Sequence, residues 1–138
     1  MRRLAPLSLA LLCCGLAPAE EAPPAAAEQP PATHQEAARQ LIILLSDTEE
    51  CLASCVDKDS VQAALPRFRE LAARAVALKA AQSRLPDPTT QDYMLDQAQI
   101  KAFSTFWEAV NKHIERLDKA KLITPELREI LHLAPEGS

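Results

Sequence analysis

The sequence has 138 residues, a length typical of one small domain, and its only glycines are Gly15 and Gly137. This scarcity of glycine excludes a phosphate-binding loop, a dinucleotide-binding fingerprint and Asn-Gly hairpin turns. The formal net charge of −4 and the lack of a large basic patch argue against nucleic acid as a partner.

Residues 1–19 are typical of a secretory signal peptide. Arg2 and Arg3 form a short basic start, an apolar run covers residues 4–16, and Ala17-Pro18-Ala19 fits the small-x-small cleavage pattern. A transmembrane helix needs about 20 apolar residues, which is more than this run provides. We therefore expect export to the periplasm or the extracellular space. Cleavage after Ala19 would leave 13 basic and 19 acidic side chains, a net charge of −6.

A second processing route remains open at the N-terminus. Leu11-Leu12-Cys13-Cys14 resembles a bacterial lipobox, in which Cys14 would be lipidated and become the first residue. The fit is imperfect, because Cys13 stands where a Gly, Ala or Ser normally precedes the lipidated cysteine. A lipid on Cys14 would anchor the protein at a bacterial membrane, and this is the only membrane contact that we expect.

Residues 20–33 have the composition of a linker. They include four prolines, three glutamates and five alanines, so they cannot bury enough apolar surface to fold. We predict a disordered linker over residues 20–33, followed by a helical bundle domain over residues 34–134.

Apolar residues at steps of three and four predict long helices over about 33–57, 60–84 and 89–121. Pro66 in the second helix should bend it or delay its regular part. Thr124-Pro125-Glu126 predicts a short fourth helix that ends before Pro135. Residues suited to cap the three long helices are Thr33 with Glu36, Asp59 or Ser60, and Thr89 with Asp92, so that the third helix starts near Thr89 or Thr90.

Short connections make consecutive helices antiparallel neighbours. The predicted fold is therefore all-α, an up-down-up bundle of three long helices closed at one end by the short fourth helix. The first helix is mainly acidic and the second mainly basic, which favours their pairing modestly. The expected core stripes include Leu41, Leu44, Cys51, Cys55 and Val56 on the first helix, Leu65, Phe68, Leu71, Ala72 and Val76 on the second, and Ile100, Phe103, Trp107, Val110, Ile114 and Leu117 on the third.

Cys51 and Cys55 are predicted to be unpaired core thiols. Export favours disulfides, but Cβ atoms at positions i and i+4 of a helix lie about 5–6 Å apart, and a disulfide needs about 3.5–4.5 Å. Buried cysteine packs as a small hydrophobic residue. The alternative is a metal or redox pair, although no histidine or third cysteine is at hand.

The three histidines, His34, His113 and His132, have no partners at metal-ligand spacing. We expect His113 to be half-buried and His34 and His132 to face solvent. The sequence contains no catalytic constellation. We therefore predict no catalytic, metal-binding or cofactor-binding residues, no cofactor and no enzymatic activity.

Four aromatic residues gather on or near the third predicted helix. Phe103 and Trp107 continue its apolar stripe, so we expect them in the core. Tyr93 and Phe106 lie off the centre of the stripe. If these two were exposed together, they would form a patch for a protein partner.

The segments Leu52 to Ser60 (LASCVDKDS) and Val61 to Pro66 (VQAALP), followed by Phe68 and Leu71, resemble a group of small exported bacterial Ala-rich helical proteins, which are often lipoproteins. The closing segment Ile123 to Leu131 (ITPELREIL) is similar to the end of such proteins. This chain departs from the pattern at Cys55, where an apolar valine is expected. The group has no established activity, so the resemblance implies export and a helical fold alone.

Two classes of function remain. The first is a non-enzymatic interaction or structural module, secreted or tethered to the cell envelope, that binds a protein partner there through a helical surface. The second is a carrier that holds a small apolar ligand between its helices. A real internal cavity, rather than close alanine packing, would favour the carrier.

Overall fold

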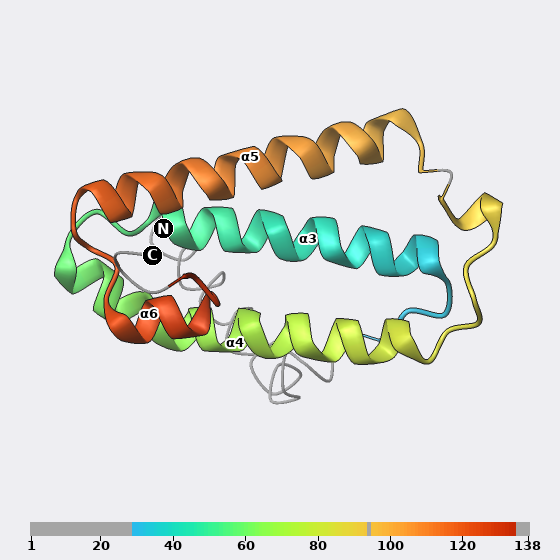
Figure 1. The fold of residues 1–138 in the computed structure, drawn as a ribbon, viewed down its shortest axis with the longest axis horizontal. Helices are drawn as coiled ribbons and strands as arrows, with labels where there is room; N and C mark the ends of the chain where they lie inside the picture. The colour runs from blue at the N-terminus through green and yellow to red at the C-terminus, as the bar shows by residue number, and fades with distance from the viewer. Residues whose placement is uncertain (1–28, 94, 135–138) are drawn as a thin grey trace, which may run out of the picture. The chain divides into compact units, whose positions relative to one another are not determined.

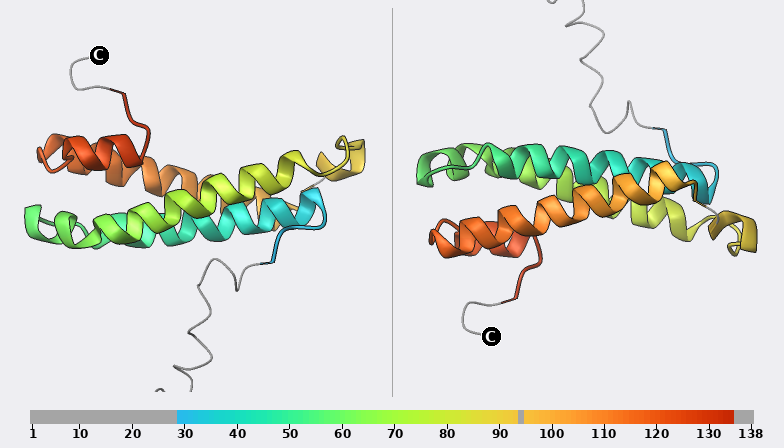
Figure 2. Two further views of the ribbon diagram at one scale, coloured as in Figure 1. Left: turned by 90° about the horizontal axis from the view of Figure 1, so that it is seen from below. Right: turned by 90° about the horizontal axis from the view of Figure 1, so that it is seen from above.

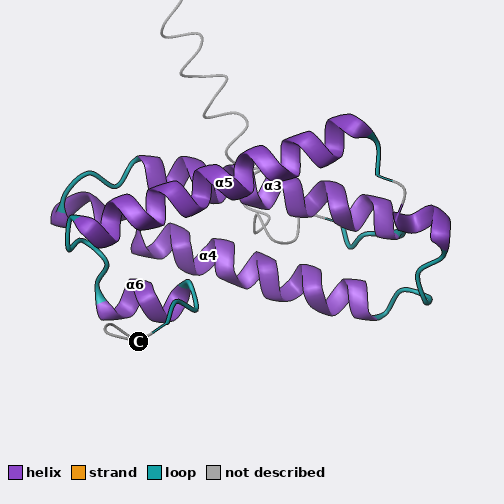
Figure 3. Ribbon diagram, turned by 45° about the horizontal axis from the view of Figure 1, so that its top comes forward, coloured by secondary structure: helices purple, strands orange, loops and turns teal. Residues whose placement is uncertain are grey.

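The computed structural model describes residues 29–93 and 95–134, in which every regular element is a helix and none is a strand. The elements in chain order are α3 (His34–Ala53), α4 (Lys58–Ser83), the 3-10 helix η1 (Thr90–Tyr93), α5 (Gln97–Lys119) and α6 (Pro125–Ile130) (Figures 1 and 3). They belong to one unit that begins at Pro31. The all-α class, with three long helices and a short fourth, is confirmed. The predicted signal peptide, Cys14 and most of the predicted linker lie outside the described residues.

α3 begins at the predicted cap. Thr33 Oγ1 accepts the backbone N–H of Glu36 at 3.1 Å, which satisfies one of the unpaired donors of the first turn. The Glu36 carboxylate accepts the N–H of Ala32 at 2.7 Å instead of that of Thr33. The reciprocal half of the capping box is therefore formed one residue earlier than expected.

The turn between α3 and α4 corrects the prediction for both helices. α3 ends at Ala53, and Asp57 caps α4 in place of Asp59 or Ser60. The Asp57 carboxylate accepts the N–H of Ser60 at 2.8 Å, and the Ser60 hydroxyl accepts the N–H of Asp57 at 2.9 Å. The first of these hydrogen bonds holds the pKa of Asp57 below its usual value. Because the helix has already ended, Val56 leaves the apolar stripe and is 67% exposed.

α4 runs without interruption from Lys58 to Ser83 and includes Pro66, whose side chain is exposed and whose nitrogen has no N–H to donate to the carbonyl four residues earlier. Pro66 therefore does not delay the regular helix.

α5 begins later than predicted. The Thr89 hydroxyl and N–H both donate to the Asp92 carboxylate, at 2.9 and 2.6 Å, so this pair organises only the single turn of η1. These hydrogen bonds lower the pKa of Asp92. The cap of α5 is Asp96, which forms a full capping box with Gln99. The short helix α6 starts at the predicted cap Thr124, with Pro125 in its first turn.

α3 is the central helix. It packs on α4 along one side and on α5 along the other, as the views in Figures 1 and 2 agree. α4 and α5 do not pack along one another, so the expectation that all consecutive helices are neighbours is wrong for this pair. The cause is the long connection through η1, which carries the chain from one side of α3 to the other. α6 packs against α4.

The core is concentrated at the α6 end of the bundle. The most deeply buried side chains come from the end of α3, the first half of α4, the end of α5 and α6: Leu52, Cys55, Val61, Leu65, Phe68, Leu117 and Leu127. Large apolar side chains toward the other end are exposed, among them Leu41 at 38%, Val76 at 64% and Ile100 at 48%. α6 is short, so it covers only one end of the space beside α3 and α4.

Candidate functional site

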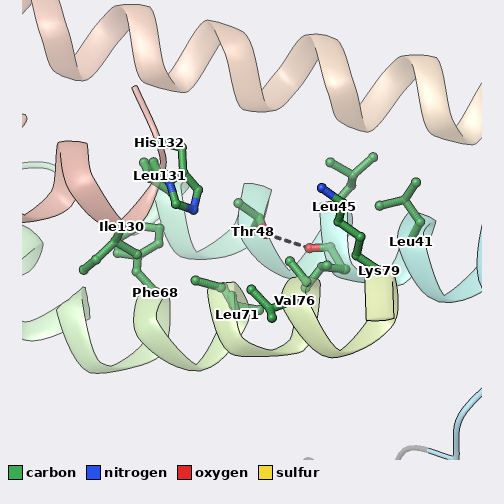
Figure 4. A pocket seen from close by; sticks show the side chains of 13 residues that line it. Leu41, Leu45, Thr48, Phe68, Leu71, Val76, Lys79, Ile130, Leu131 and His132 are labelled. Atoms are coloured by element: carbon green, nitrogen blue, oxygen red, sulfur yellow. Dashed lines mark hydrogen bonds between the residues drawn. The ribbon is translucent and has the colours of Figure 1, made fainter. Parts of the chain in front are cut away.

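An apolar pocket of about 420 Å³ lies between α3 and α4, directly beyond the end of α6 (Figure 4). Its floor and walls are mostly aliphatic. The lining residues are Leu41, Leu44, Leu45 and Thr48 of α3, Phe68, Leu71, Ala72, Ala75, Val76 and Lys79 of α4, and Ile130, Leu131 and His132 at the end of α6.

Helical spacing explains why these side chains meet. Leu41, Leu45 and Thr48 follow at steps of four and three, so they share one face of α3. Ala72, Val76 and Lys79 have the same spacing on α4. The alanines on α4 leave room between the helices that a larger residue would fill. The Thr48 hydroxyl donates to the Leu44 carbonyl at 2.7 Å, so it needs no partner from the pocket.

α6 forms the closed end of the pocket. Its Leu127 is fully buried, and Ile130 and Leu131 pack against the same core. The helix then ends in a Schellman motif, in which the N–H of Leu133 bonds to the carbonyl of Arg128 at 2.9 Å and His132 has a φ of 53°. This turn places His132, which is exposed as predicted, at the edge of the pocket (Figure 4).

A second pocket of about 190 Å³ continues the first toward the start of α3. The two pockets share Leu41, Leu44, Ala75 and Lys79, and the second extends to His34 and Gln82. We call the two together the α3/α4 groove. It follows α3 from Thr48 back to His34, about 15 residues or about 22 Å at the rise of an α-helix.

The apolar line of α5 explains why Trp107 is not in the core. Ile100, Trp107 and Ile114 are spaced by seven residues, so their side chains lie on one face of α5. Ile114 packs against the core near α6, but Trp107 is 52% exposed, so its prediction as a core residue is wrong. Its ring stacks on Phe103, with centroids 6.1 Å apart. Beyond the reach of α6, no other described helix covers this line.

The opposite edge of α5 is fixed to α3 by polar contacts. His113 Nε2 lies 3.1 Å from the Glu49 carboxylate, and its Nδ1 lies 3.3 Å from the Arg116 guanidinium. His113 is half-buried, as predicted. Because His113 marks the edge of α5 that meets Glu49, Trp107, six residues earlier, lies on the other edge of α5.

Cys51 and Cys55 are buried and free, as the helical spacing predicted. Burial, with a contribution from the neighbouring Cys55 thiol, raises the pKa of Cys51 to about 11. Burial also raises the pKa of Cys55, whose Sγ lies 3.4 Å from the Cys51 carbonyl oxygen. Both thiols are therefore protonated at neutral pH, which disfavours nucleophilic or metal-binding chemistry. Within residues 29–93 and 95–134, no three side chains of the metal-binding types lie together.

The predicted aromatic patch of Tyr93 and Phe106 remains a prediction. The side chain of Tyr93 lies outside the described part of the chain. Phe106 is partly buried. It precedes Val110 by one turn and His113 by two, so it lies on the edge of α5 that faces α3.

The sequence prediction missed the groove because it assigned Leu41, Ala72 and Val76 to the core. A signal was present. The apolar stripes of the first two helices are wider than one neighbouring helix covers, and the fourth helix is too short to cover the remainder.

Comparison with protein-family models, with curated proteins and with solved structures finds no match to this chain. None of the helices in the described part of the chain is both long enough and apolar enough to cross a membrane.

Proposed function

We propose that this protein is a non-enzymatic interaction module whose α3/α4 groove binds an amphipathic helix of a partner protein. The module acts after export, in the periplasm, outside the cell or tethered to a bacterial membrane through Cys14. The N-terminal sequence supports this location through its basic start, apolar run and small-x-small cleavage pattern.

The observation that carries the proposal is the continuity of the groove with the docking site of α6. α6 buries Leu127 fully and packs Ile130 and Leu131 against the core, an apolar pattern with steps of three and four. The α3/α4 groove continues past His132 with a similar aliphatic lining, and no helix among residues 29–93 and 95–134 fills it. A partner helix with apolar residues at i, i+3, i+4 and i+7 would extend the packing that α6 begins.

The length and openness of the groove favour a helix over a compact ligand. A channel of about 22 Å accepts about four helical turns. The exposed fractions of Leu41 and Val76 show that the groove is open along its side. A docked helix would cover this open side.

The test uses a synthetic, tryptophan-free helical peptide of about 15 residues, with leucines at i, i+3, i+4 and i+7 and glutamine on its other face. Trp107 is the only tryptophan of the chain and reports binding through its fluorescence. Val76→Glu should weaken binding by at least about tenfold, since it places a charge in the apolar contact.

The matched control is Val56→Glu. Val56 is exposed to a similar extent, 67% against 64% for Val76, but lies in the turn between α3 and α4, away from the groove. This variant should bind like the unaltered protein. Equal loss in both variants, or no binding of the peptide to the unaltered protein, would count against the proposal.

A carrier of a small apolar ligand is the second candidate, and the pocket beside α6 is the observation that favours it. Its volume of about 420 Å³ falls within the range of small-molecule sites, and its lining is mainly aliphatic. An apolar dye that binds with a one-to-one ratio, is lost in Val76→Glu and is not displaced by the helical peptide would favour the carrier.

A further inference from the structure

The ionisable side chains of the α3/α4 groove are all basic. Among the described residues that line its two pockets there is no Asp or Glu, whereas His34, Lys79 and His132 are present. Composition does not explain this, because the whole chain has a formal net charge of −4. The groove therefore combines an apolar floor with one lysine, two histidines and no carboxylate.

Two of these basic groups are available to a partner. His34 Nε2 is held 2.7 Å from the Pro86 carbonyl oxygen. The ammonium group of Lys79 and the ring of His132, in contrast, have no hydrogen-bond or ion-pair partner within the described part of the chain. They lie at different ends of the larger pocket, His132 beside α6 and Lys79 toward Leu41 (Figure 4).

The arginines on the same helix are different. Arg74 lies 2.7 Å from the Asp47 carboxylate, and Arg67 lies 2.9 Å from Glu70. Arg69 pairs with Glu126 of α6. This last pair joins α4 to α6, the helix that closes one end of the α3/α4 groove. An acidic side chain on a docked helix thus has a precedent within the chain itself.

We infer that the occupant of the α3/α4 groove is an acidic amphipathic helix, with apolar anchors against α3 and α4 and Asp or Glu on the flanks that face Lys79 and His132. This inference rests on the proposed function and names the chemistry of the partner. Charge pairs at the rim of an interface add little affinity, but they speed encounter and reject partners of like charge.

The test compares two tryptophan-free peptides with the same leucine pattern, one with glutamates and one with glutamines at the flanking positions. Each is titrated into the full mature chain at neutral pH, with Trp107 fluorescence as the readout. The acidic peptide should bind about threefold tighter at low salt, the size expected for exposed ion pairs. The difference should disappear in high salt, which screens exposed charges.

Lys79→Gln should abolish the preference for the acidic peptide, measured as the ratio of the two peptides' dissociation constants in the same variant. Lys112→Gln is the matched control, because Lys112 is exposed on α5 and does not line the groove. It should leave the preference intact. Circular dichroism checks that both variants are folded.

The outcomes separate this inference from the proposed function. Equal binding of both peptides overturns the acidic partner and leaves helix binding standing. A preference that survives Lys79→Gln also overturns it. Failure of both peptides overturns helix binding itself. If laurate then binds in their place and loses affinity in Lys79→Gln, the occupant is a free anionic amphiphile rather than a helix.

Discussion

Single residues in this protein show that position on a helix stripe does not decide burial. Trp107 and Phe68 both lie on apolar stripes, yet Trp107 is 52% exposed and Phe68 is 1% exposed. The difference comes from the neighbours. Phe68 faces α3 and α6, whereas Trp107 faces the part of the bundle that α6 does not reach.

Trp107→Ala should lower the free energy of unfolding by about 1 kcal/mol, because a half-exposed side chain leaves no closed cavity. This replaces the loss of about 3–5 kcal/mol that a core tryptophan would give. Phe68→Ala is the comparison and should cost about 3–5 kcal/mol, measured by urea unfolding. A loss for Trp107→Ala as large as that for Phe68→Ala would contradict the open arrangement.

The buried thiols give a prediction that depends on pH. At pH 8 the native protein should react very slowly with a thiol reagent, because burial raises the pKa of Cys51 to about 11 and raises that of Cys55. In denaturant the mature chain should show two reactive thiols, provided that cleavage follows Ala19.

The raised pKa of Cys51 also makes stability fall in alkali. The Cys51 thiol ionises in the unfolded chain near its ordinary pKa of 9.0 but resists ionisation in the folded chain up to about 11. The unfolded state is therefore favoured progressively as pH rises through this window. Cys51→Ala should flatten the pH dependence of the unfolding midpoint between these values. An unchanged slope would contradict the raised pKa of Cys51 in the folded chain.

At the scale of elements, α5 completes the C-terminus of α3. The last turn of α3 contains no basic residue. Arg116 of α5 supplies one, donating to the carbonyl oxygens of Cys55 at 2.9 Å and Leu52 at 3.0 Å. These bonds satisfy acceptors at the end of the helix and oppose the negative end of its dipole.

Arg116→Lys should therefore be destabilising although it keeps the charge, since an ammonium group cannot reproduce the two-pronged contact. We expect a loss of about 1–2 kcal/mol in the free energy of unfolding. Lys119→Gln, in the last turn of α5, is the control and should change stability by less than about 0.5 kcal/mol. Equal effects would mean that Arg116 acts only as a surface charge.

The pairing of α3 with α4 has a similar anchor. Asp47 lies 2.7 Å from Arg74 and 3.9 Å from Arg67, and the Arg74 side chain is only 11% exposed. Asp47→Ala should lower the free energy of unfolding by about 1–2 kcal/mol, less than the loss of a fully buried pair. The exposed neighbour Glu50→Ala should have little effect. Thermal unfolding of the two variants side by side measures the difference.

For the whole molecule, the sequence predicted those features of the fold that depend on residues close together in the chain. The caps Thr33 and Thr124 and the alternation of three and four residues specified where helices form. The start of α5 was missed because Thr89 and Asp92 do bond to each other as a helix start would, but the helix that follows Thr89 is the single turn of η1, and α5 starts only after Asp96. The groove was missed because exposure depends on how far α6 extends over α3 and α4, which periodicity does not encode.

Helix docking in the α3/α4 groove is the central claim, and amide chemical-shift mapping tests it most directly. Titration of the isotope-labelled protein with the acidic, tryptophan-free helical peptide should shift the amides of Leu41, Thr48, Ala72 and Val76 and the indole N–H of Trp107. The amides of Ile43 and Val56, exposed away from the groove, should stay in place. Shifts confined to those two residues, or no shifts at peptide concentrations well above that of the protein, would contradict the account.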